Sequence, residues 1–355
     1  VELVEPAGCP RFAGRLIRGI DPTARSPVWM TERLRRAGLR GISPVVDITN
    51  LVMLELGQPL HAYDAALLSG PIRPRLARPG EKVTLLDEKE IELNDDTMII
   101  TDDSGPIGIA GIMGGLSTAV SGKTTDVFFE GAFWPQDFMA GRARNYGMHT
   151  DASLRFERGV DPEGQGRAVE RATELLLEIA GGNAGPLVVN SSEEHLPHRA
   201  TITLRKSRLA HLLGIEIADT EVVQILESLQ MNVEPVEGGW RVKGPSHRFD
   251  MEYEVDLIEE IARIHGYDSI PETTLSARSP LETVTESRIE MERAAATLIA
   301  RDYQEVVTYS FIDADANTRF SGVESELVLS NPISSELSVM RSSLLPGMVV
   351  AAAAN

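Results

Sequence analysis

Three short segments carry side chains whose types and spacing could support catalysis. Residues 57–64 read GQPLHAYD and contain His61, residues 128–134 read FFEGAFW and contain Glu130, and residues 149–158 crowd hydrogen-bonding side chains into HTDASLRFER. A histidine can act as a general base or hold a water molecule. A carboxylate among aromatic residues is costly to bury unless a donor pairs with it. Together these segments indicate a polar site within packed surroundings.

The same side chains also have plain structural interpretations. A lone histidine is often a hydrogen-bonded structural residue, and alternation along a strand could point Glu130 at solvent. Residues 109–115, IAGIMGG, contain Gly111 and Gly114, which are small enough for a ligand to reach the backbone amides. The sequence has no G-x-S-x-G elbow, no H-E-x-x-H motif and no pair of cysteines. The usual patterns of serine hydrolases and zinc enzymes are therefore lacking.

The elements that must position these side chains predict a mixed α/β domain over residues 1–190. One helix is expected to begin at Ser26 as N-cap and to end before Gly38, and another to begin at Asp161 and to end at Gly181. Short strands with tight glycine-rich turns are predicted at residues 45–56, 82–93, 97–115 and 126–134.

A polar, proline-containing stretch at residues 190–200 marks a domain boundary. Beyond it, residues 198–274 predict two short helices, 206–214 and 219–230, and a hairpin or wing at 231–247. This order is winged-helix-like and is found in DNA-binding domains. The second helix, however, carries acids and neither lysine nor arginine, so we expect no reading of a DNA groove.

A third region over residues 282–355 is predicted to begin with a long helix at 286–303 and to continue into a strand at 305–312. The chain starts at a valine and stops in the uncapped run MVVAAAAN. Both ends lack the signals that close a domain, so we expect a piece of a longer protein.

Composition indicates a multidomain globular protein. The chain has 355 residues, of which 42% are hydrophobic and 25% charged, enough for two or three cores. Cys9 is its single cysteine, so no internal disulfide can form, which fits a reducing compartment. The sequence shows no apolar stretch of about eighteen residues and no signal-peptide pattern at its start. We therefore expect a cytoplasmic protein that does not enter the membrane.

The net charge of −19 opposes non-specific binding to nucleic acid, because that mode needs clustered cations. Residues 11–40 carry a local positive charge, since this segment contains many arginines and, as its only acids, Asp21 and Glu32. From charge alone, a solvated helix face explains this segment. An anion-binding surface stays open as the alternative.

Several blocks, in chain order, resemble the β subunit of bacterial phenylalanyl-tRNA synthetase. They are SPVVDITNLVMLELGQPLHAYD, GIAGIMGG, FFEGAFW, GRARNYGMHTDASLRFERGVDP, PSHRFDMEYEVDLIEEIARIHGYDSIP and NPISSELSVMRSSLLPG. The resemblance implies a multidomain α+β protein with three parts. These are a mixed α/β tRNA-editing domain (B3/B4) over residues 1–190, a small winged-helix-like B5 domain over 198–274, and the truncated start of a class II synthetase-like, catalytic-type domain (B6) over 282–355.

The resemblance also implies a function for the polar segments. A pocket shaped for phenylalanine cannot strongly reject tyrosine, which only adds a hydroxyl, so a second site must hydrolyse mischarged tyrosyl-tRNA(Phe). Carried over by motif, Glu130 would accept the tyrosine phenol, and backbone amides near Gly111 and Gly114 would assist. His61 and Thr150 would act at the aminoacyl ester.

Two further positions follow from the same motifs: Ala152 would line the pocket, and Arg40 would lie toward the 3′ end of the tRNA. The resemblance implies that water, held by His61, backbone and tRNA, is the attacking group. The chain departs from the family pattern conservatively at Leu60 and Tyr63, which flank His61.

An acidic cluster in the second domain could bind a cation. Asp256, Glu259 and Glu260 have the spacing of one helix face, with Asp250 just upstream. Negative charge near a helix N-terminus explains them without a ligand. Carboxylate oxygens also suit Mg²⁺, and the resemblance places Mg²⁺ here, shared with the α subunit. The partners it implies are the α subunit in an α2β2 heterotetramer and tRNA(Phe), with ATP a substrate on α, and neither DNA nor membrane.

Two other classes of function stay open. A free-standing ester hydrolase would use His61 as the base and Asp151 to orient it, and would act on small esters without tRNA. A non-catalytic scaffold would keep the fold with an inactive pocket, and would not bind tyrosine in a way that depends on Glu130.

Overall fold

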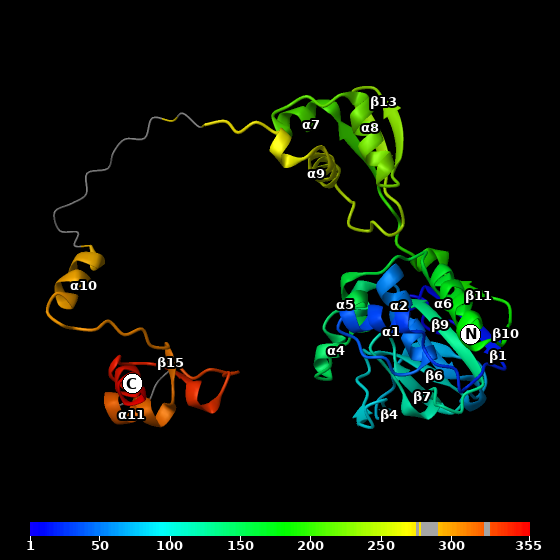
Figure 1. Ribbon diagram of the computed structural model, residues 1–355, viewed down its shortest axis with the longest axis horizontal. Coiled ribbons are helices and arrows are strands. Elements are labelled where there is room, and N and C mark those ends of the chain that lie inside the picture. The colour runs from blue at the N-terminus through cyan, green and yellow to red at the C-terminus, as the bar shows by residue number, and fades with distance from the viewer. Residues whose placement is uncertain (275–276, 278–289, 323–326) are drawn as a thin grey trace. The chain divides into compact units, whose positions relative to one another are not determined.

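The computed structural model describes residues 1–274, 277, 290–322 and 327–355. It divides into two compact units, Val1–Glu272 and Thr273–Asn355, and each is described by itself. Helices and strands alternate irregularly in both units, so the fold is mixed α+β, as predicted (Figure 1). Among the described residues, no helix is both long enough and apolar enough to cross a bilayer.

A five-stranded antiparallel sheet forms the centre of the first domain (Figure 1). Its strands are β1 (Arg11–Arg18), β2 (His61–Asp64), β9 (Asp126–Phe133), β10 (Asn183–Ala184) and β11 (Val188–Ser191). β1 and β9 pair along their whole length. The short strand β2 pairs with the other edge of β9, and β10 and β11 pair with the other edge of β1. β9 therefore has a paired strand along each of its two edges.

Three helices pack against one face of this sheet, namely α1 (Val28–Arg36), α2 (Pro44–Leu56) and α6 (Gln165–Ala180). Alternate strand residues such as Ala13, Ile17 and Phe129 point into this layer because side chains of a strand alternate between faces. Ile48 of α2 and Leu176 of α6 meet them with no exposed surface. This layer is one of the two cores of the domain.

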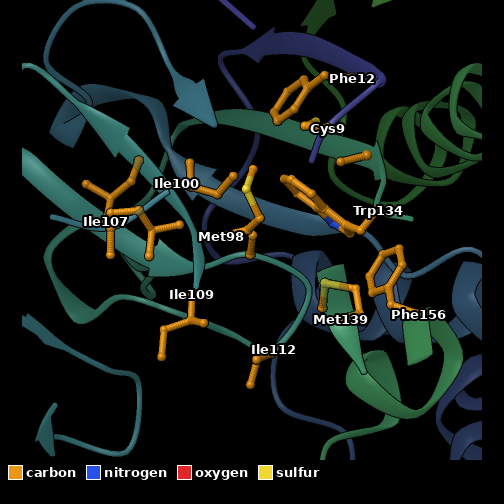
Figure 2. Packing of buried hydrophobic residues seen from close by; sticks show 14 of the residues in the cluster. Cys9, Phe12, Met98, Ile100, Ile107, Ile109, Ile112, Trp134, Met139 and Phe156 are labelled. Atoms are coloured by element: carbon orange, nitrogen blue, oxygen red, sulfur yellow. The ribbon is translucent and has the colours of Figure 1, made fainter. Parts of the chain in front are cut away.

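A second antiparallel sheet contributes the core on the opposite face. Its strands, in spatial order, are β3 (Arg73–Leu76), β6 (Met98–Asp102), β7 (Gly105–Ile109) and β8 (Met113–Gly114), and a separate hairpin is formed by β4 (Lys82–Thr84) and β5 (Glu90–Glu92). Ile100, Ile107 and Ile109 share a buried cluster with Phe12 of β1 and with Trp134, which follows β9 (Figure 2). The first sheet is therefore covered on both faces, so that a charge on either face is desolvated.

The strands predicted at residues 82–93, 97–115 and 126–134 are confirmed, but the strand predicted at 45–56 is wrong. That segment is helix α2. Ser43 accepts a hydrogen bond from the Val46 amide, and proline occupies the first helical position. Gly57, at φ 71°, ends the helix in a left-handed conformation. These end signals outweigh the β-branched residues that favoured a strand.

Two predicted helix starts are also corrected. Ser26 does not cap α1, because its hydroxyl donates to Asp47 at 2.5 Å and Pro27 occupies the N-cap position. The Asp161 carboxylate accepts a hydrogen bond from the Glu163 amide at 2.9 Å and so stabilises a turn, and α6 begins only at Gln165. The predicted end of α6 at Gly181 is confirmed. Serine and aspartate also stabilise turns and tertiary contacts, so their presence alone does not fix a helix start.

Short elements complete the first domain. They are η1 (Ala65–Leu67), η2 (Leu116–Thr118), α3 (Gln136–Met139), α4 (Arg142–Asn145), α5 (Asp151–Arg158) and η3 (Glu193–His195). Met139 of α3 and Phe156 of α5 reach the second core beside Trp134 (Figure 2). The segment at residues 149–158 is thereby anchored against the two sheets.

A smaller domain follows in the same unit. It contains β12 (Thr201–Arg205), α7 (Lys206–Leu213), α8 (Asp219–Ser228), β13 (Asn232–Val236), β14 (Gly239–Lys243), α9 (Glu254–His265) and η4 (Tyr267–Ser269). Its sheet has the order β12–β14–β13, and Leu204, Leu226, Trp240 and Leu257 form the core. The two predicted short helices and the hairpin after them are confirmed.

The second unit contains α10 (Met291–Ile299), β15 (Phe311–Ile312), α11 (Ala314–Ser321), η5 (Ser335–Leu337), β16 (Val339–Met340) and α12 (Leu345–Ala354). The helix predicted at 286–303 is shorter than expected, and its residues 286–289 lie outside the described part. The strand predicted at 305–312 is reduced to β15, which within the described part of the chain pairs with β16 alone. Val307 is 92% exposed, so strand propensity without a partner strand does not form a ladder there.

Candidate functional site

Glu130 lies on the face of β9 that points toward the second sheet. On the same face, Phe128 and Ala132 join the core between the sheets, whereas Val127 and Phe129 pack beneath the helices. Because both faces of the sheet are covered, alternation buries Glu130, and its exposed fraction is 6%. The interpretation of Glu130 as a solvent-facing strand residue is therefore wrong.

His61 faces Glu130 directly across the β2–β9 ladder. Burial lowers the pKa of His61 to about 4 because the imidazolium loses its hydration, so the ring is neutral at pH 7. Among the described residues its Nε2 has no hydrogen-bond partner. The ring packs on Gly114, where a Cβ would come within 2.3 Å of the His61 Cε1. Only glycine leaves room for the imidazole at this position.

Tyr63, two residues after His61, joins the pair. Its hydroxyl donates to Oε2 of Glu130 at 2.5 Å, and its ring lies edge-on to the His61 ring with centroids 4.4 Å apart. Burial raises the pKa of Glu130 to about 7, an effect that the Tyr63 hydrogen bond partly offsets. Burial and the nearby Glu130 also raise the pKa of Tyr63 and of the Cys9 thiol. The site therefore holds a carboxyl group that titrates near neutral pH.

These side chains border a small cavity of about 80 Å³ between the two sheets. Five of the predicted site residues line it, namely His61, Gly111, Gly114, Glu130 and Ala152. Most of the remaining wall is apolar and includes Ile109, Ile112, Trp134 and Phe156 (Figure 2). The cavity thus combines a largely apolar set of side chains with one carboxyl group, one imidazole and the Tyr63 hydroxyl.

The glycine-rich turn and the start of α5 are held together beside the cavity. Gly111 has φ 65°, which favours glycine, and a Cβ there would come within 2.7 Å of Met139 and 2.9 Å of Phe156. Thr150 caps α5 by accepting the Ser153 amide, and its hydroxyl donates to the carbonyl of Ile112 at 3.1 Å. Thr150 thus positions the cavity wall and is not among the lining residues.

Two other sequence candidates lie away from the cavity. Arg40 is exposed and does not line the wall, so its role toward a tRNA end stays a prediction. Asp151 is also exposed, and its carboxylate pairs with Arg155 at 3.0 Å. The hydrolase alternative requires Asp151 to orient His61, and the structure does not support that pair.

The acids of the smaller domain are paired with arginines. Asp250 and Glu260 both contact Arg248, at 2.8 and 3.0 Å, and Glu260 also contacts Arg263 at 2.7 Å. These hydrogen bonds lower the pKa of Glu260 to about 2, first through Arg263 and then through Arg248. The carboxylates therefore already have positively charged partners within the chain.

The other two acids have different settings. Asp256 accepts the backbone amides of Glu252 and Tyr253 and so caps α9, whereas Glu259 is exposed. Within the described ranges, no group of three or more histidine, cysteine or acidic side chains could hold a metal ion. Because Mg²⁺ keeps several waters and is held by one or two carboxylates, the assignment of Mg²⁺ to these acids stays a prediction.

Three domain families match the chain in sequence order. They are the B3/4 domain over residues 8–181, the tRNA synthetase B5 domain over 202–267 and the phenylalanyl tRNA synthetase beta chain CLM domain over 270–355. The chain belongs to the family of phenylalanyl-tRNA synthetase β subunits. The sequence-based assignment to this family is confirmed.

Relatives in this family match nearly the whole chain. The phenylalanine–tRNA ligase beta subunit of Pseudomonas fluorescens is 51% identical over 99% of the chain, and that of Nitrosococcus oceani is 48% identical over 99%. The chain spans 44% of the length of these β subunits. A solved N-terminal fragment of the phenylalanyl-tRNA synthetase β subunit from Pyrococcus horikoshii aligns with 73% of the chain and over 72% of its own length, at 16% sequence identity. Its TM-score of 0.36 is too low to bear on the fold.

Tyr63 is the member of this β-subunit site that motif reasoning left without a role. Its two-residue spacing from His61 places both side chains on one face of a strand, and that spacing is readable in the sequence. The carboxyl group that its hydroxyl reaches belongs to Glu130, 67 residues away, which lies opposite His61 and diagonal to Tyr63 in the ladder. Only the register of β2 against β9 shows that the tyrosine reaches the carboxyl group.

Proposed function

We propose that the first domain hydrolyses tyrosyl-tRNA(Phe), the ester formed when tyrosine is attached in place of phenylalanine. The observation that carries this proposal is Glu130, a carboxyl group 6% exposed at the wall of a cavity whose lining side chains are mostly apolar. Apolar walls suit an aromatic ring, and a buried carboxylate suits the one hydroxyl that distinguishes tyrosine from phenylalanine. Membership of the synthetase β-subunit family supplies the substrate class.

The preference for tyrosine over phenylalanine would come from the hydrogen bond that the ligand donates to Glu130. A phenol donating to a carboxylate forms a charge-assisted hydrogen bond, worth about 1.5–3 kcal/mol. Phenylalanine fills the same apolar space and offers no donor. A buried polar group that loses its partner penalises the wrong ligand far more than a missing methylene does, so tyrosine is preferred.

Hydrolysis requires a water molecule at the ester carbonyl. The neutral His61 can accept a proton at Nε2, the atom without a partner among the described residues. Water attacks the carbonyl carbon, the bond from that carbon to the tRNA 3′ oxygen breaks, and a proton passes to the leaving oxygen, releasing tyrosine and tRNA. With a pKa near 4, His61 orients the water more than it deprotonates it.

Entry of a tyrosine side chain would move the cavity wall. The cavity of about 80 Å³ is smaller than the roughly 150 Å³ of an engineered cavity that binds benzene. The wall at residues 108–114 contains Gly108, Gly111 and Gly114, whose lack of side chains leaves the backbone free to adjust. We expect this turn to shift outward when the ring binds.

The whole β subunit would act with a partner. We propose that it joins an α subunit as α2β2 in the cytoplasm, that α attaches phenylalanine to tRNA(Phe) with ATP, and that Arg40 lies toward the tRNA 3′ end. A Mg²⁺ ion at Asp250, Asp256, Glu259 and Glu260 would need ligands from α as well, and no step of the hydrolysis is assigned to it.

The test is deacylation of tyrosyl-tRNA(Phe) by the assembled synthetase. His61→Ala should slow hydrolysis while aminoacylation by the same preparation stays unchanged. His211→Ala is the matched control, because His211 is an exposed residue of α7. Equal hydrolysis by wild type and His61→Ala would contradict the role of His61, and no hydrolysis by the wild type would favour the scaffold alternative.

A further inference from the structure

One oxygen of the Glu130 carboxyl group already accepts a hydrogen bond within the protein, before any ligand binds. Tyr63 donates to Oε2 at 2.5 Å, and among the described residues no other side chain is seen to hydrogen bond to Glu130. A carboxylate has two oxygens and can accept several donors. Tyr63 is 1% exposed, and its ring is fixed between His61 and Phe128. A rigid donor therefore holds one oxygen and leaves the second for a ligand.

We propose that Tyr63 is a positioning residue for tyrosine recognition, whose hydroxyl orients the Glu130 carboxylate by one oxygen so that the other receives the phenol of the substrate. The inference rests on the proposed function and deepens it. A phenylalanine at position 63 would fill the same space without this hydrogen bond.

The hydroxyl also favours the ionised form of Glu130. A donor to a carboxylate lowers its pKa, and the Tyr63 bond acts in this direction against the effect of burial. Around neutral pH, where Glu130 titrates, this bond raises the charged fraction of the carboxyl group against the larger effect of burial. An ionised acceptor forms the stronger bond to a phenol, so Tyr63 would sustain selectivity at physiological pH.

Few other groups can titrate beside this pair. His61 and Cys9 are neutral near pH 7, since burial lowers the pKa of the first and raises that of the second. Asp102 at the end of β6 acts on Tyr63, whose pKa its charge raises. The glycine-rich turn and α5 contribute only apolar residues to the cavity wall. A titration near pH 7 can therefore be assigned to Glu130.

The first test is an infrared pH titration of the chain. The carboxylic acid band that disappears in Glu130→Gln identifies the group, and its midpoint in the wild type should lie at about 7. In Tyr63→Phe the midpoint should move upward by about one to two pH units. Tyr146→Phe is the matched control, because Tyr146 loses a hydroxyl bonded to Thr97 and to the Asn94 amide. An unchanged midpoint in Tyr63→Phe would overturn the inference.

The second test compares deacylation of tyrosyl- and phenylalanyl-tRNA(Phe) by the assembled synthetase. Tyr63→Phe should reduce the preference for tyrosine by about fivefold to tenfold at pH 7, with a smaller loss at higher pH, where Glu130 ionises without help. A higher preference in Tyr63→Phe would show that Tyr63 competes with the substrate and would overturn the inference. A wild type that does not hydrolyse tyrosyl-tRNA(Phe) would overturn the proposed function as well, whereas a selective wild type with an unaltered Tyr63→Phe would overturn this inference alone.

Discussion

Glu130 and His61 face each other as a cross-strand pair of β9 and β2, and burial moves their pKa values in opposite directions, to about 7 and about 4. Both shifts favour the neutral form, because the covered sheet removes hydration from either charge. At pH 7 the imidazole is neutral and the carboxyl group is near its midpoint. The same cavity therefore contains the acceptor nitrogen of His61 and the Glu130 carboxyl group, which changes its charge near pH 7.

This pair predicts opposing contributions to stability. Between pH 4.5 and 7 the folded Glu130 retains a proton that the unfolded one releases, so its contribution to the free energy of unfolding falls as pH rises. Between pH 4 and 6.5 only the unfolded His61 binds a proton, so its contribution rises with pH. Each change is about 3 kcal/mol, and the two nearly cancel in the overlapping window.

Urea unfolding at a series of pH values checks this balance. Relative to wild type, Glu130→Gln should gain stability as pH rises from about 4.5 to 7, and His61→Gln should lose stability as pH rises from about 4 to 6.5. Glu178→Gln, an exposed change on α6, serves as the control. If both site variants retain the wild-type pH dependence of the free energy of unfolding, burial does not shift the pKa values of Glu130 and His61.

Gly114→Ala should disturb the cavity. The new Cβ would lie 2.3 Å from Cε1 of His61, so the imidazole or the turn must move, at a cost of roughly 1–3 kcal/mol in the free energy of unfolding. Hydrolysis of tyrosyl-tRNA(Phe) should fall with it. Gly122→Ala has nothing within 4 Å of its Cβ and should leave both quantities unchanged. Equal behaviour of the two variants in thermal unfolding and deacylation would argue against close packing of His61 on the turn.

Glu260→Gln should destabilise the smaller domain. Glu260 is 7% exposed and pairs with Arg248 and Arg263. Its loss removes charge-assisted hydrogen bonds, but Arg248 keeps Asp250 as a partner and Arg263 is half exposed, so we expect a cost of about 1–2 kcal/mol. Its pKa is lowered to about 2, so its stabilising contribution is present above pH 4.5 and is lost as pH falls toward 2. Glu259→Gln, exposed on the same helix, is the control. Similar urea midpoints for both variants at pH 7 would contradict this account.

Magnesium should bind this chain weakly. The arginine pairs at Asp250 and Glu260 already neutralise two of the acids, and Asp256 is occupied by backbone amides. We therefore expect isothermal titration of Mg²⁺ into the chain to show no saturable heat at micromolar concentrations. A stoichiometric, tight isotherm that disappears in Glu260→Gln would show that these acids form a site without an α subunit.

The sequence could predict those elements whose signals are local. Strand alternation and flanking turns located β9, and Gly181 located the end of α6. Residues 45–56 were misassigned because their apolar run fits a buried strand as well as a buried helix, and the deciding signals at Ser43 and Gly57 lie just outside it. Length and end signals separate these cases better than β-branched content does.

The candidate site was predictable in composition and not in arrangement. Motifs singled out His61, Glu130 and the glycine-rich turn, and the fold brings all three to one cavity. The hydrogen bond from Tyr63 to Glu130 joins residues 67 positions apart. It depends on the register of two strands and on the covering of both sheet faces, neither of which a local pattern contains.

The most direct test of the central claim is the ratio of tyrosyl- to phenylalanyl-tRNA(Phe) deacylation by the assembled synthetase carrying Glu130→Ala. If the buried carboxylate recognises the tyrosine phenol, this ratio should fall about tenfold to a hundredfold relative to wild type. Aminoacylation, and the ratio in the exposed control Glu178→Ala, should stay the same. An unaltered ratio in Glu130→Ala would contradict the account and leave Glu130 as a buried structural partner of Tyr63.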